Sequence, residues 1–347
     1  MHSLYPLFRP LLFAVDPERA HRIVLTALDA AAKAGLAQLA TPRLSAAPVA
    51  AMGLAFPNRV GLAAGLDKNG AHLAGLATLG FGFLEAGTVT PRAQPGNPPP
   101  RMFRIPAAQA LVNRLGFNND GVERFVANVD SSGYQGILGI NIGRNFDTPN
   151  ERAADDYVAC LRAVHARASY VTINISSPNT EGLRDLHKEE TLKRFVGTLR
   201  DAQEKLAGKH GARKPMLLKI APDLAEAELD GVADVLLASG IDGLICTNTT
   251  IDRAPVAGLR HADESGGLSG KPLFEKSTAV LHGMAKRLGG RIPLVGVGGI
   301  VAGDDAAAKI DAGASLVQFY TGMVYRGPAL IGECVEAIRA RRAARAA

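Results

Sequence analysis

The chain has 347 residues, a formal net charge of +6 and 47% hydrophobic residues, as expected of a folded protein with a large core. Aromatic residues make up only 5% and Trp is absent, which argues against a nucleic-acid-binding protein that stacks bases. The three cysteines, Cys160, Cys246 and Cys334, are far apart in the sequence and show no C-x-x-C spacing. We therefore expect no disulfide framework, no zinc site and a reducing cytoplasmic environment. No apolar run reaches the ~20 residues that a membrane-spanning helix needs.

Residues 1–45 are predicted to form a helical extension ahead of the first strand. Asp16 is a suitable N-cap, Pro17 fits the first helical position, and Gly35 fits the position after the helix ends. The apolar residues of this helix form one stripe: Ala20, Ile23, Val24, Ala27, Leu28 and Ala31. The stripe alone favours a helix that caps the bottom of the following domain. The alternative is an amphipathic element that lies on a membrane surface or gates a ligand.

From residue 59 onward, short apolar runs alternate with longer helical segments. We expect eight buried parallel strands, because each run is almost continuously apolar. They span residues 60–65, 83–89, 137–143, 170–176, 216–221, 243–249, 293–299 and 316–322. This alternation predicts an α/β fold, a (β/α)8 TIM barrel, over residues 46–347, with a doubly wound sheet as the alternative. Residues 90–118 are rich in Pro and Gly and too long for an ordinary connection, which indicates a functional excursion.

Polar or Gly-rich segments follow nearly every predicted strand. They include AAGLDKNG at 63–70, NISSPNT at 174–180, KIAPD at 219–223 and CTNTT at 246–250. Any one of them fits an ordinary turn. Because the carboxyl ends of barrel strands meet at one rim, their concentration there predicts a binding site. Amide groups suited to a ligand with carbonyl and ring N–H groups come from Asn113, Asn141, Asn174, Asn179 and Asn248.

Two further features indicate a cofactor. Lys219 lies inside the fifth predicted strand, where an unpaired ammonium is costly to bury. It fits either a Schiff base, as in a barrel aldolase, or a positive charge held against an electron-rich cofactor ring. The glycines of GVGGI at 296–300 indicate phosphate binding, but Val301 stands where a Rossmann fingerprint needs its third glycine. A mononucleotide is therefore favoured over a dinucleotide, and the few rim carboxylates predict no metal site.

At these segments the chain resembles the quinone-linked, membrane-associated class of dihydroorotate dehydrogenases. The resemblance runs from DPERAH at 16–21 to YTGMVYRGP at 320–328, through motifs such as GLAAGLDKNG, NRLGFNN, INIGRN, NISSPNT and GGLSGKPL. It implies a barrel that binds one FMN per chain and oxidises (S)-dihydroorotate to orotate in pyrimidine biosynthesis, with ubiquinone or a similar quinone as acceptor. None of the three cysteines lies in the loop 176–185, where the soluble class has a catalytic cysteine, and this favours the quinone-linked class.

The resemblance also implies which residues form the site. Ser177 matches the catalytic base, and Thr180 and Phe117 match its neighbours on the proton path. The pyrimidine would be held by Lys68, Asn113, Arg114, Leu115, Gly116, Phe117, Asn174, Asn179, Asn248 and Thr249. The FMN would be held by Ala64, Gly65, Leu66, Asp67, Lys68, Thr88, Asn141, Asn174, Lys219, Thr247, Gly270, Gly299, Tyr320 and Thr321. Thr321 stands where Ser is common in the family.

The resemblance gives residues 1–45 a role as a quinone and membrane element. His21, Arg104 and Tyr320 would lie along the quinone passage. We expect a monomeric peripheral protein at the cytoplasmic face of the cell membrane, attracted to an anionic lipid surface. We expect no nucleic-acid partner. The residues by themselves leave two alternatives open: a Schiff-base aldolase and a basic nucleic-acid-binding protein.

Overall fold

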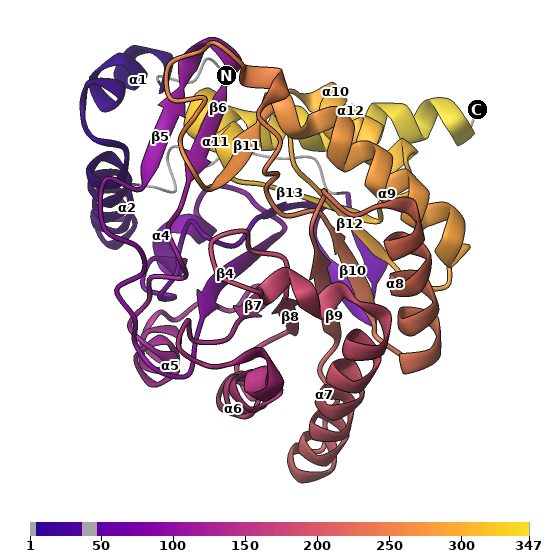
Figure 1. Cartoon of the computed structure of the whole chain (residues 1–347). Helices are drawn as coiled ribbons and strands as arrows, with labels where there is room; N and C mark the ends of the chain where they lie inside the picture. The colour runs from indigo at the N-terminus through magenta and orange to yellow at the C-terminus, as the bar shows by residue number, and fades with distance from the viewer. Residues whose placement is uncertain (1–4, 37–46, 347) are drawn as a thin grey trace.

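Eight parallel strands close into a barrel, which confirms the predicted α/β barrel (Figure 1). The computed structural model describes residues 5–36 and 47–346. The strands pair in chain order, and the last strand then pairs with the first through Val317 opposite Val60. This pairing closes the cylinder, so the alternative of an open doubly wound sheet is wrong. The strands are β3 Val60–Leu62, β4 Phe83–Val89, β7 Leu138–Ile142, β8 Tyr170–Asn174, β9 Met216–Ile220, β10 Gly243–Cys246, β12 Leu294–Val297 and β13 Leu316–Phe319.

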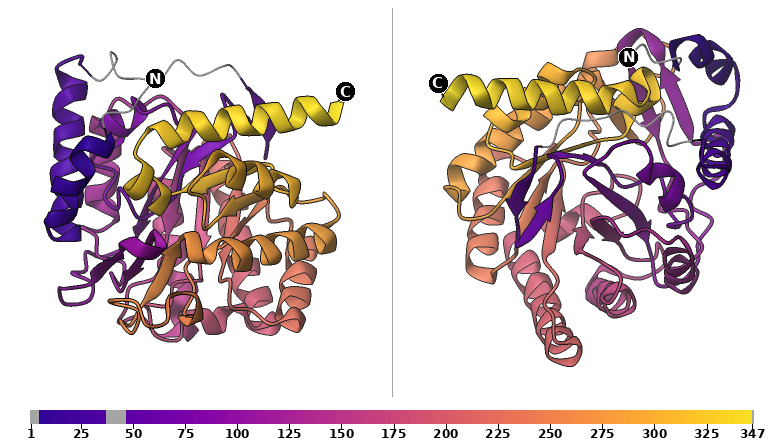
Figure 2. Two further views of the ribbon diagram at one scale, coloured as in Figure 1. Left: turned by 90° about the horizontal axis from the view of Figure 1, so that it is seen from above. Right: turned by 180° about the vertical axis from the view of Figure 1, so that it is seen from behind.

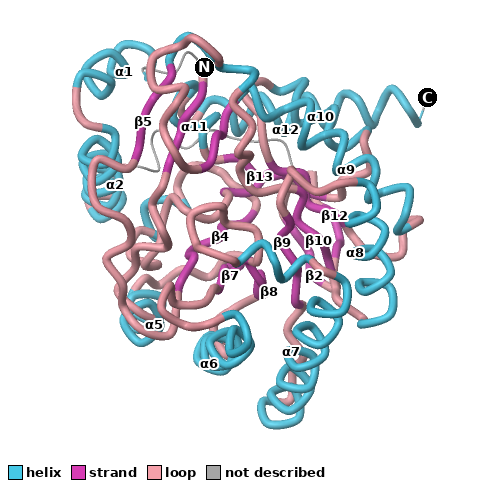
Figure 3. Tube along the Cα trace, in the orientation of Figure 1, coloured by secondary structure: helices cyan, strands magenta, loops and turns pink. Residues whose placement is uncertain are grey.

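Helices cover the outside of the barrel, with the strands inside them (Figures 2 and 3). Strands such as β4 and β9 are buried along their whole length because they pack on helices outside and on one another's side chains inside. The main hydrophobic core fills the layer between helices and strands. The outer helices are α4 Leu73–Ala77, α5 Val122–Ser131, α6 Ala153–Val164, α7 Glu189–His210, α8 Glu226–Ser239, α9 Phe274–Leu288, α10 Gly303–Asp311, α11 Thr321–Arg326 and α12 Ala329–Ala346.

A short hairpin, β1 Val49–Ala51 and β2 Leu54–Phe56, closes the amino-terminal end of the barrel. Phe56 is fully buried and packs edge-on against Phe83, with 5.1 Å between the ring centroids. Phe83 in turn packs against Tyr170, and this cluster fills the lower part of the barrel. The expectation that the N-terminal helix caps the bottom is therefore wrong, because the hairpin occupies that end.

Two helices, α1 Tyr5–Ala14 and α2 Pro17–Lys33, form the described part of the N-terminal extension. Asp16 caps α2 as predicted, since its carboxylate accepts a backbone N–H of the first turn at 2.9 Å. Gly35 follows the helix with a positive φ of 71°, as a glycine at that position does. α2 packs against α4 and β5 at the side of the barrel (Figure 1).

The apolar stripe of α2 is only partly covered by the rest of the molecule. Ala20 is buried, whereas Ile23 and Val24 are 48% and 40% exposed. The predicted boundary between extension and barrel, at residues 45 and 46, lies outside the described residues. Across 5–36 and 47–346, no helix is both long and apolar enough to span a bilayer.

The Pro- and Gly-rich excursion contains two strands, β5 Met102–Ile105 and β6 Ala110–Asn113, which the sequence pattern did not reveal. They pair antiparallel, and β6 also pairs antiparallel with β11 Gly267–Gly270. β5 contacts α2, and β11 contacts α11. This small sheet therefore joins the N-terminal helices to the carboxyl-terminal rim of the barrel.

Candidate active site

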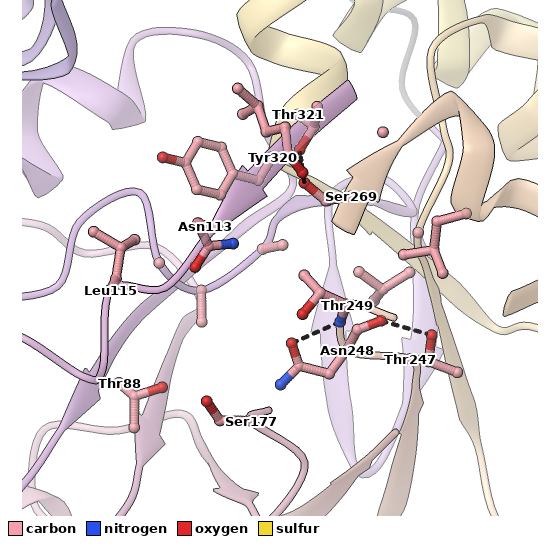
Figure 4. A pocket seen from close by; sticks show the side chains of 18 of the residues that line it. Thr88, Asn113, Leu115, Ser177, Thr247, Asn248, Thr249, Ser269, Tyr320 and Thr321 are labelled. Carbon is pink, nitrogen blue, oxygen red and sulfur yellow. Dashed lines mark hydrogen bonds between the residues drawn. The ribbon is translucent and has the colours of Figure 1, made fainter. Parts of the chain in front are cut away.

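A cavity opens at the carboxyl-terminal ends of the barrel strands, where the sequence predicted a binding site. It encloses about 1100 Å³ of empty space, counted out to its open mouth. Figure 4 shows side chains from the rim loops, from the small sheet and from the end of β13 around this space. The predicted residues that line it are Ala64, Gly65, Lys68, Thr88, Asn113, Leu115, Gly116, Phe117, Asn174, Ser177, Asn179, Lys219, Thr247, Asn248, Thr249, Gly270, Gly299, Tyr320 and Thr321.

The charge of this rim cavity is positive. Among the described residues, its lining includes two lysines and no carboxylate. Lys219 is buried in β9, and no hydrogen-bond or ion-pair partner for its ammonium is found in the described part of the chain. Burial lowers the pKa of Lys219, an effect that the nearby Glu85 carboxylate opposes, and burial lowers the pKa of Lys68 to about 8. Such a cavity suits a ligand that carries negative charge.

A buried carboxylate anchors the polar residues at the centre of the barrel. Glu85 lies in β4 with no exposure, a feature that the sequence analysis missed although a charge stands within an apolar run there. Its oxygens accept hydrogen bonds from the side chains of Asn141, Tyr170, Thr172 and Gln318. The Asn141 carbonyl accepts the Thr88 hydroxyl at 2.6 Å, and Asn174 donates to the same Thr88 oxygen at 3.0 Å. The network therefore fixes the Asn174 amide before any ligand binds.

A second set of hydrogen bonds places two asparagines side by side. The Asn174 carbonyl accepts the Ser176 hydroxyl at 3.0 Å and the Asn248 amide at 3.3 Å. The Asn248 amide also donates to Ser176 Oγ at 3.0 Å, and its carbonyl accepts the N–H of Thr249 (Figure 4). Fixed amides of this kind offer a planar ligand both donors and acceptors in one orientation.

Ser177 lies in the loop after β8, and its side chain faces the cavity (Figure 4). The residue is 5% exposed, and its Oγ accepts the backbone N–H of Asn179 at 3.2 Å. Within the described residues the Ser177 hydroxyl has no protein acceptor for its own hydrogen. The Asn179 side-chain amide donates to the backbone carbonyl of Asn113 at 3.2 Å, which ties this loop to β6. The loop is thus more than a turn, because its hydroxyl and amide groups form part of the cavity wall.

Five predicted residues do not line the cavity: Leu66, Asp67, Arg114, Asn141 and Thr180. Asp67 accepts two backbone N–H groups of the turn that follows it, at 3.0 and 2.8 Å. Arg114 pairs with Glu264 at 2.7 Å and stacks over the Phe103 ring, so its charge is already partnered. Asn141 hydrogen-bonds to Thr88, and Thr88 rather than Asn141 lines the cavity. Direct ligand contacts of these five residues stay predictions.

The cavity also contains residues that the sequence analysis missed. Ser269 shares a hydrogen bond of 2.8 Å with Thr321 (Figure 4). Its position in the motif GGLSGKPL was the signal that pointed to it. The remaining lining residues, mostly apolar or glycine, are Ala63, Met102, Leu111, Pro178, Leu273, Val297, Gly298, Ile300, Phe319 and Gly322.

The ends of β11, β12 and β13 meet in a part of the cavity built from backbone and hydroxyl groups. A Cβ on Gly270 would lie 3.0 Å from the Thr321 side chain, and one on Gly322 would lie 2.1 Å from the Ile300 carbonyl. The described residues provide no acceptor for the backbone N–H of Gly299. Free N–H groups and hydroxyls without a carboxylate are the donor set that a phosphate group needs. Together with the Lys219 ammonium, they fit a phosphorylated, electron-rich cofactor.

A second cavity meets the rim cavity and differs from it in chemistry. It has about 870 Å³ of empty space, counted out to its open mouth, and its lining is almost entirely apolar side chains of α1, α2, α4, α11 and the small sheet. Met102, Leu111 and Tyr320 line both cavities. The two spaces therefore adjoin at these three side chains, one open to polar solutes and the other to apolar ones.

The three residues predicted for a quinone passage, His21, Arg104 and Tyr320, all line this apolar cavity. Burial lowers the pKa of His21 to about 3, which keeps its ring neutral at physiological pH. Arg104 donates to the Val15 carbonyl at 2.8 Å and lies over the Phe13 ring. Its buried Nε has no hydrogen-bond partner among the described residues. A neutral imidazole and a guanidinium with one unsatisfied N–H therefore stand in an otherwise apolar wall.

Comparisons with known proteins agree with this architecture. Residues 47–341 match the family model described as dihydroorotate dehydrogenase. The chain is 61% identical over 333 residues to the dihydroorotate dehydrogenase (quinone) of Thiobacillus denitrificans, covering 96% of this chain and 98% of that protein. The protein of the same name from Burkholderia multivorans is 58% identical over 342 residues, 99% of each chain. Ligand-free DHODH from Eimeria tenella has a TM-score of 0.83 at 38% identity, covering 93% of this chain and 94% of that one. The chain belongs to the dihydroorotate dehydrogenase family, in its quinone-linked class.

Proposed function

We propose that FMN, one molecule per chain, is the flavin of this quinone-linked dihydroorotate dehydrogenase, and that the rim cavity holds it beside the pyrimidine. The enzyme oxidises dihydroorotate to orotate in pyrimidine biosynthesis and passes the electrons to a quinone. The observation that carries the proposal is the meeting of a polar and an apolar cavity at Tyr320. A flavin at this junction is open to a polar substrate on one side and to an apolar acceptor on the other.

The residues of the rim fit FMN by their chemistry. When bound, FMN supplies the acceptor for the hydride that leaves C6 of dihydroorotate. Lys219, whose ammonium has no partner among the residues that the structure describes, would hold positive charge against the electron-rich part of the ring. Thr88 and Asn174 present fixed polar groups, and the Gly299 N–H with the Thr321 hydroxyl would hold the phosphate.

The pyrimidine would bind against the amides of the rim. The cavity is lined by four asparagines whose side chains each share a protein hydrogen bond, namely Asn113, Asn174, Asn179 and Asn248. For Asn113 this bond is a long one, 3.4 Å from the Asn179 amide to Asn113 Oδ1. Their donors and acceptors match the ring N–H and carbonyl groups of dihydroorotate. Lys68 would give the substrate carboxylate a positive partner. Amides fixed in advance reduce the entropy lost on binding, which is the positioning part of catalysis.

Ser177 would take the proton from C5 of dihydroorotate, as the resemblance implies. A serine hydroxyl is a poor base at neutral pH, so it must pass its own proton onward, through Thr180 or a water molecule. The Asn179 N–H that Ser177 Oγ accepts would stabilise this oxygen as negative charge develops on it. Charge that develops toward the C4 carbonyl would be stabilised by the amide donors of the rim.

The apolar cavity would be the quinone passage, which His21, Arg104 and Tyr320 line, with ubiquinone or a similar quinone as the acceptor. The Arg104 guanidinium would donate to a quinone carbonyl, since its Nε has no partner among the described residues. α1 and α2 form the outer side of this cavity, so the passage would open between these helices. An apolar entrance of this kind keeps the quinone away from the polar mouth that dihydroorotate uses.

α1 would rest on the lipid surface. Leu7, Phe8 and Leu11 on this helix are 71%, 55% and 69% exposed, which is unusual for a row of large apolar side chains. Arg19 and Arg22 are exposed on α2 beside it and would attract anionic lipid head groups. We infer a monomeric peripheral protein on the cytoplasmic face of the cell membrane, anchored by these helices.

The flavin proposal is tested on the purified protein. Flavin released by denaturation is identified by chromatography, and we expect one FMN per chain. Dihydroorotate added without oxygen should bleach the visible flavin absorbance, and a quinone added afterwards should restore it. Protein that carries no FMN, or FMN that dihydroorotate does not bleach, would contradict the proposal.

The membrane proposal is tested by sedimentation with phospholipid vesicles. We expect binding to vesicles that contain anionic lipid and weaker binding to zwitterionic ones. Replacing Leu7, Phe8 and Leu11 together by Ser should abolish the binding, because the apolar contact is lost. The control is Phe146→Ser, which removes an aromatic side chain elsewhere that is 69% exposed, more than Phe8, and should change nothing. Equal binding by the triple variant and the wild type would contradict a role of α1 at the membrane.

A further inference from the structure

A lysine that the proposed reaction does not use lies fully buried between α9 and α10. Lys309 has no exposure, and its Cβ stands 3.0 Å from where a Cβ on Gly296 of β12 would be. Among the described residues no carboxylate lies within ion-pair distance of its ammonium. Burial lowers the pKa of Lys309 to about 7, which Cys246 and Asp305 oppose in part. The partners of the ammonium are Ser277 Oγ, the Phe274 carbonyl and the face of the Phe274 ring, whose centroid lies 5.0 Å from Nζ, and none of them carries a full negative charge.

The ammonium of Lys309 is connected to the cavity through one hydroxyl group. Its Nζ donates to Ser277 Oγ at 2.5 Å, and Ser277 Oγ donates to the Gly298 carbonyl at 3.0 Å. The Ser277 hydrogen has a second possible acceptor, the Phe274 carbonyl at 3.2 Å. That carbonyl already accepts the Thr278 hydroxyl at 2.6 Å and lies 3.5 Å from Lys309 Nζ. The Ser277 hydroxyl hydrogen therefore bonds to the Gly298 carbonyl rather than to the Phe274 carbonyl.

The Gly298–Gly299 turn rests directly on the start of α9. Both residues have positive φ angles, 110° and 83°, which L side chains rarely adopt. A Cβ on Gly298 would lie 2.9 Å from Ser277 Oγ, and one on Gly299 would lie 2.2 Å from the Phe274 Cα. The same Gly298 Cβ would lie 3.0 Å from the Leu273 side chain, so Ser277 and Leu273 together limit where the turn can lie.

The direction of the Gly298 carbonyl determines the direction of the next N–H group. The Gly298–Gly299 peptide is not among the cis peptides, and in a trans peptide the C=O and N–H bonds point in opposite directions. Because the Gly298 carbonyl points to Ser277 outside the barrel, the Gly299 N–H points away from α9. Gly298 and Gly299 both line the rim cavity on that side, and the Gly299 N–H has no acceptor in the described chain.

We propose that Lys309 is a positioning residue for phosphate recognition: through Ser277 it fixes the Gly298–Gly299 peptide with its N–H toward the phosphate group of the cofactor. The inference rests on the proposed FMN site. Lys309 touches neither the cofactor nor the substrate, and it acts by orienting a backbone donor.

The test compares FMN with riboflavin, which has the same ring system and no phosphate. Full-length holoenzyme is diluted, and flavin release is followed by fluorescence to obtain the Kd of FMN. The same protein reloaded with riboflavin gives the second Kd. In Lys309→Met, which keeps the shape of the side chain, we expect the Kd of FMN to rise about tenfold, the effect of one lost hydrogen bond with charge support. The Kd of riboflavin should not change.

Two further variants make the test specific. Ser277→Ala breaks the same connection and should show the same selective loss, and the double variant should lose no more than either single one. Lys286→Met removes an exposed lysine at the other end of α9 and should leave both Kd values unchanged. If Lys309→Met does not fold, the Kd values of Ser277→Ala test the inference by themselves. This variant is expected to fold because it lacks only one oxygen atom.

Three outcomes overturn the inference. In the first, folded Lys309→Met and Ser277→Ala keep the wild-type preference for FMN over riboflavin. In the second, both ligands weaken equally, which shows a general packing role. In the third, the wild type itself binds riboflavin as tightly as FMN. Only the third also refutes the proposed phosphate site, so failure of the inference and failure of the proposed function are distinguishable.

Discussion

Ser177 occupies a position suited to a base, although its hydroxyl is intrinsically a weak one. The prediction is that Ser177→Ala keeps FMN and binds orotate but loses about 10²- to 10⁴-fold in kcat, the usual effect of a positioned base. The fold should persist, because within residues 5–36 and 47–346 Ser177 Oγ takes part in a single hydrogen bond, from the Asn179 backbone. Stopped-flow measurement of flavin reduction isolates this step. Ser177→Cys, which keeps a group able to act as a base, should lose less. Wild-type rates of flavin reduction in Ser177→Ala would refute the assignment.

Lys219 has no carboxylate partner in the described structure, so its charge is available to a ligand. We expect Lys219→Met to raise the Kd of FMN by about 10- to 100-fold, which is the effect of losing a hydrogen bond to a charged group. The exposed Lys193→Met is the control and should bind FMN normally. In the wild type, borohydride treatment with a carbonyl substrate should leave Lys219 unmodified. A trapped adduct at Lys219 would contradict this account and support the Schiff-base alternative.

Lys68 predicts a pH dependence because burial lowers its pKa to about 8. Below that pH the ammonium is charged and can pair with the substrate carboxylate, and above it the positive charge is lost. The value of kcat/KM for dihydroorotate, which reports the free enzyme, should therefore fall as pH rises above about 8. Lys68→Arg, which stays charged, should shift this fall to higher pH. An identical alkaline fall in wild type and Lys68→Arg would show that another group titrates.

Residue types alone located some site residues and misplaced others. Asn174 and Asn248 could be predicted because both follow a strand directly, and such positions face the rim. Arg114 follows Asn113 in the same motif just after β6 ends, yet its side chain turns away to Glu264 and the Phe103 ring, which no sequence pattern shows. Glu85 was missed because its role depends on partners from three other strands, which no local pattern shows.

At the scale of elements, periodicity predicted the barrel strands and failed for the small sheet. All eight barrel strands lie within the predicted segments, since each is a continuous apolar run. β5 and β6 lie in a segment rich in proline, which hides the alternation typical of strands. β11 pairs with β6 from more than 150 residues away, so closeness in the sequence does not indicate the pairing either. The β1–β2 hairpin occupies the end of the barrel where α2 was expected. Its strands have three residues each, too few to show an alternation of apolar and polar residues.

Two neighbouring residues on α2 allow a matched test of the apolar cavity. Val24 lines this cavity, whereas Ile23 does not, and both are similarly exposed. We expect Val24→Trp to fill the passage and lower kcat/KM for a quinone by about tenfold or more, equivalent to about 1.4 kcal/mol of lost binding. Flavin reduction by dihydroorotate should be unchanged. Ile23→Trp should leave both half-reactions near wild type. Equal loss in the two variants would show that the surface of α2 matters and the cavity does not.

At the scale of the whole molecule, the barrel rim, the small sheet and the N-terminal helices surround one junction. The rim half of the site could be predicted, because the carboxyl ends of parallel strands always meet. The apolar half could not be derived from periodicity, since Met102, Leu111 and Tyr320 come from three elements that only the folded chain brings together. The resemblance to the family supplied His21 and Arg104, and the structure places both in the same cavity.

The central claim is that two substrates use separate entrances to one flavin. The direct test is anaerobic stopped-flow measurement on the full chain and on a chain that lacks residues 1–45. We predict that the shortened protein keeps FMN and is reduced by dihydroorotate at the wild-type rate, because the rim cavity is intact. It should fail to be reoxidised by a long-tail quinone, although a small water-soluble acceptor still reoxidises it. A folded, FMN-loaded shortened protein that reduces the long-tail quinone at the full rate would contradict the claim.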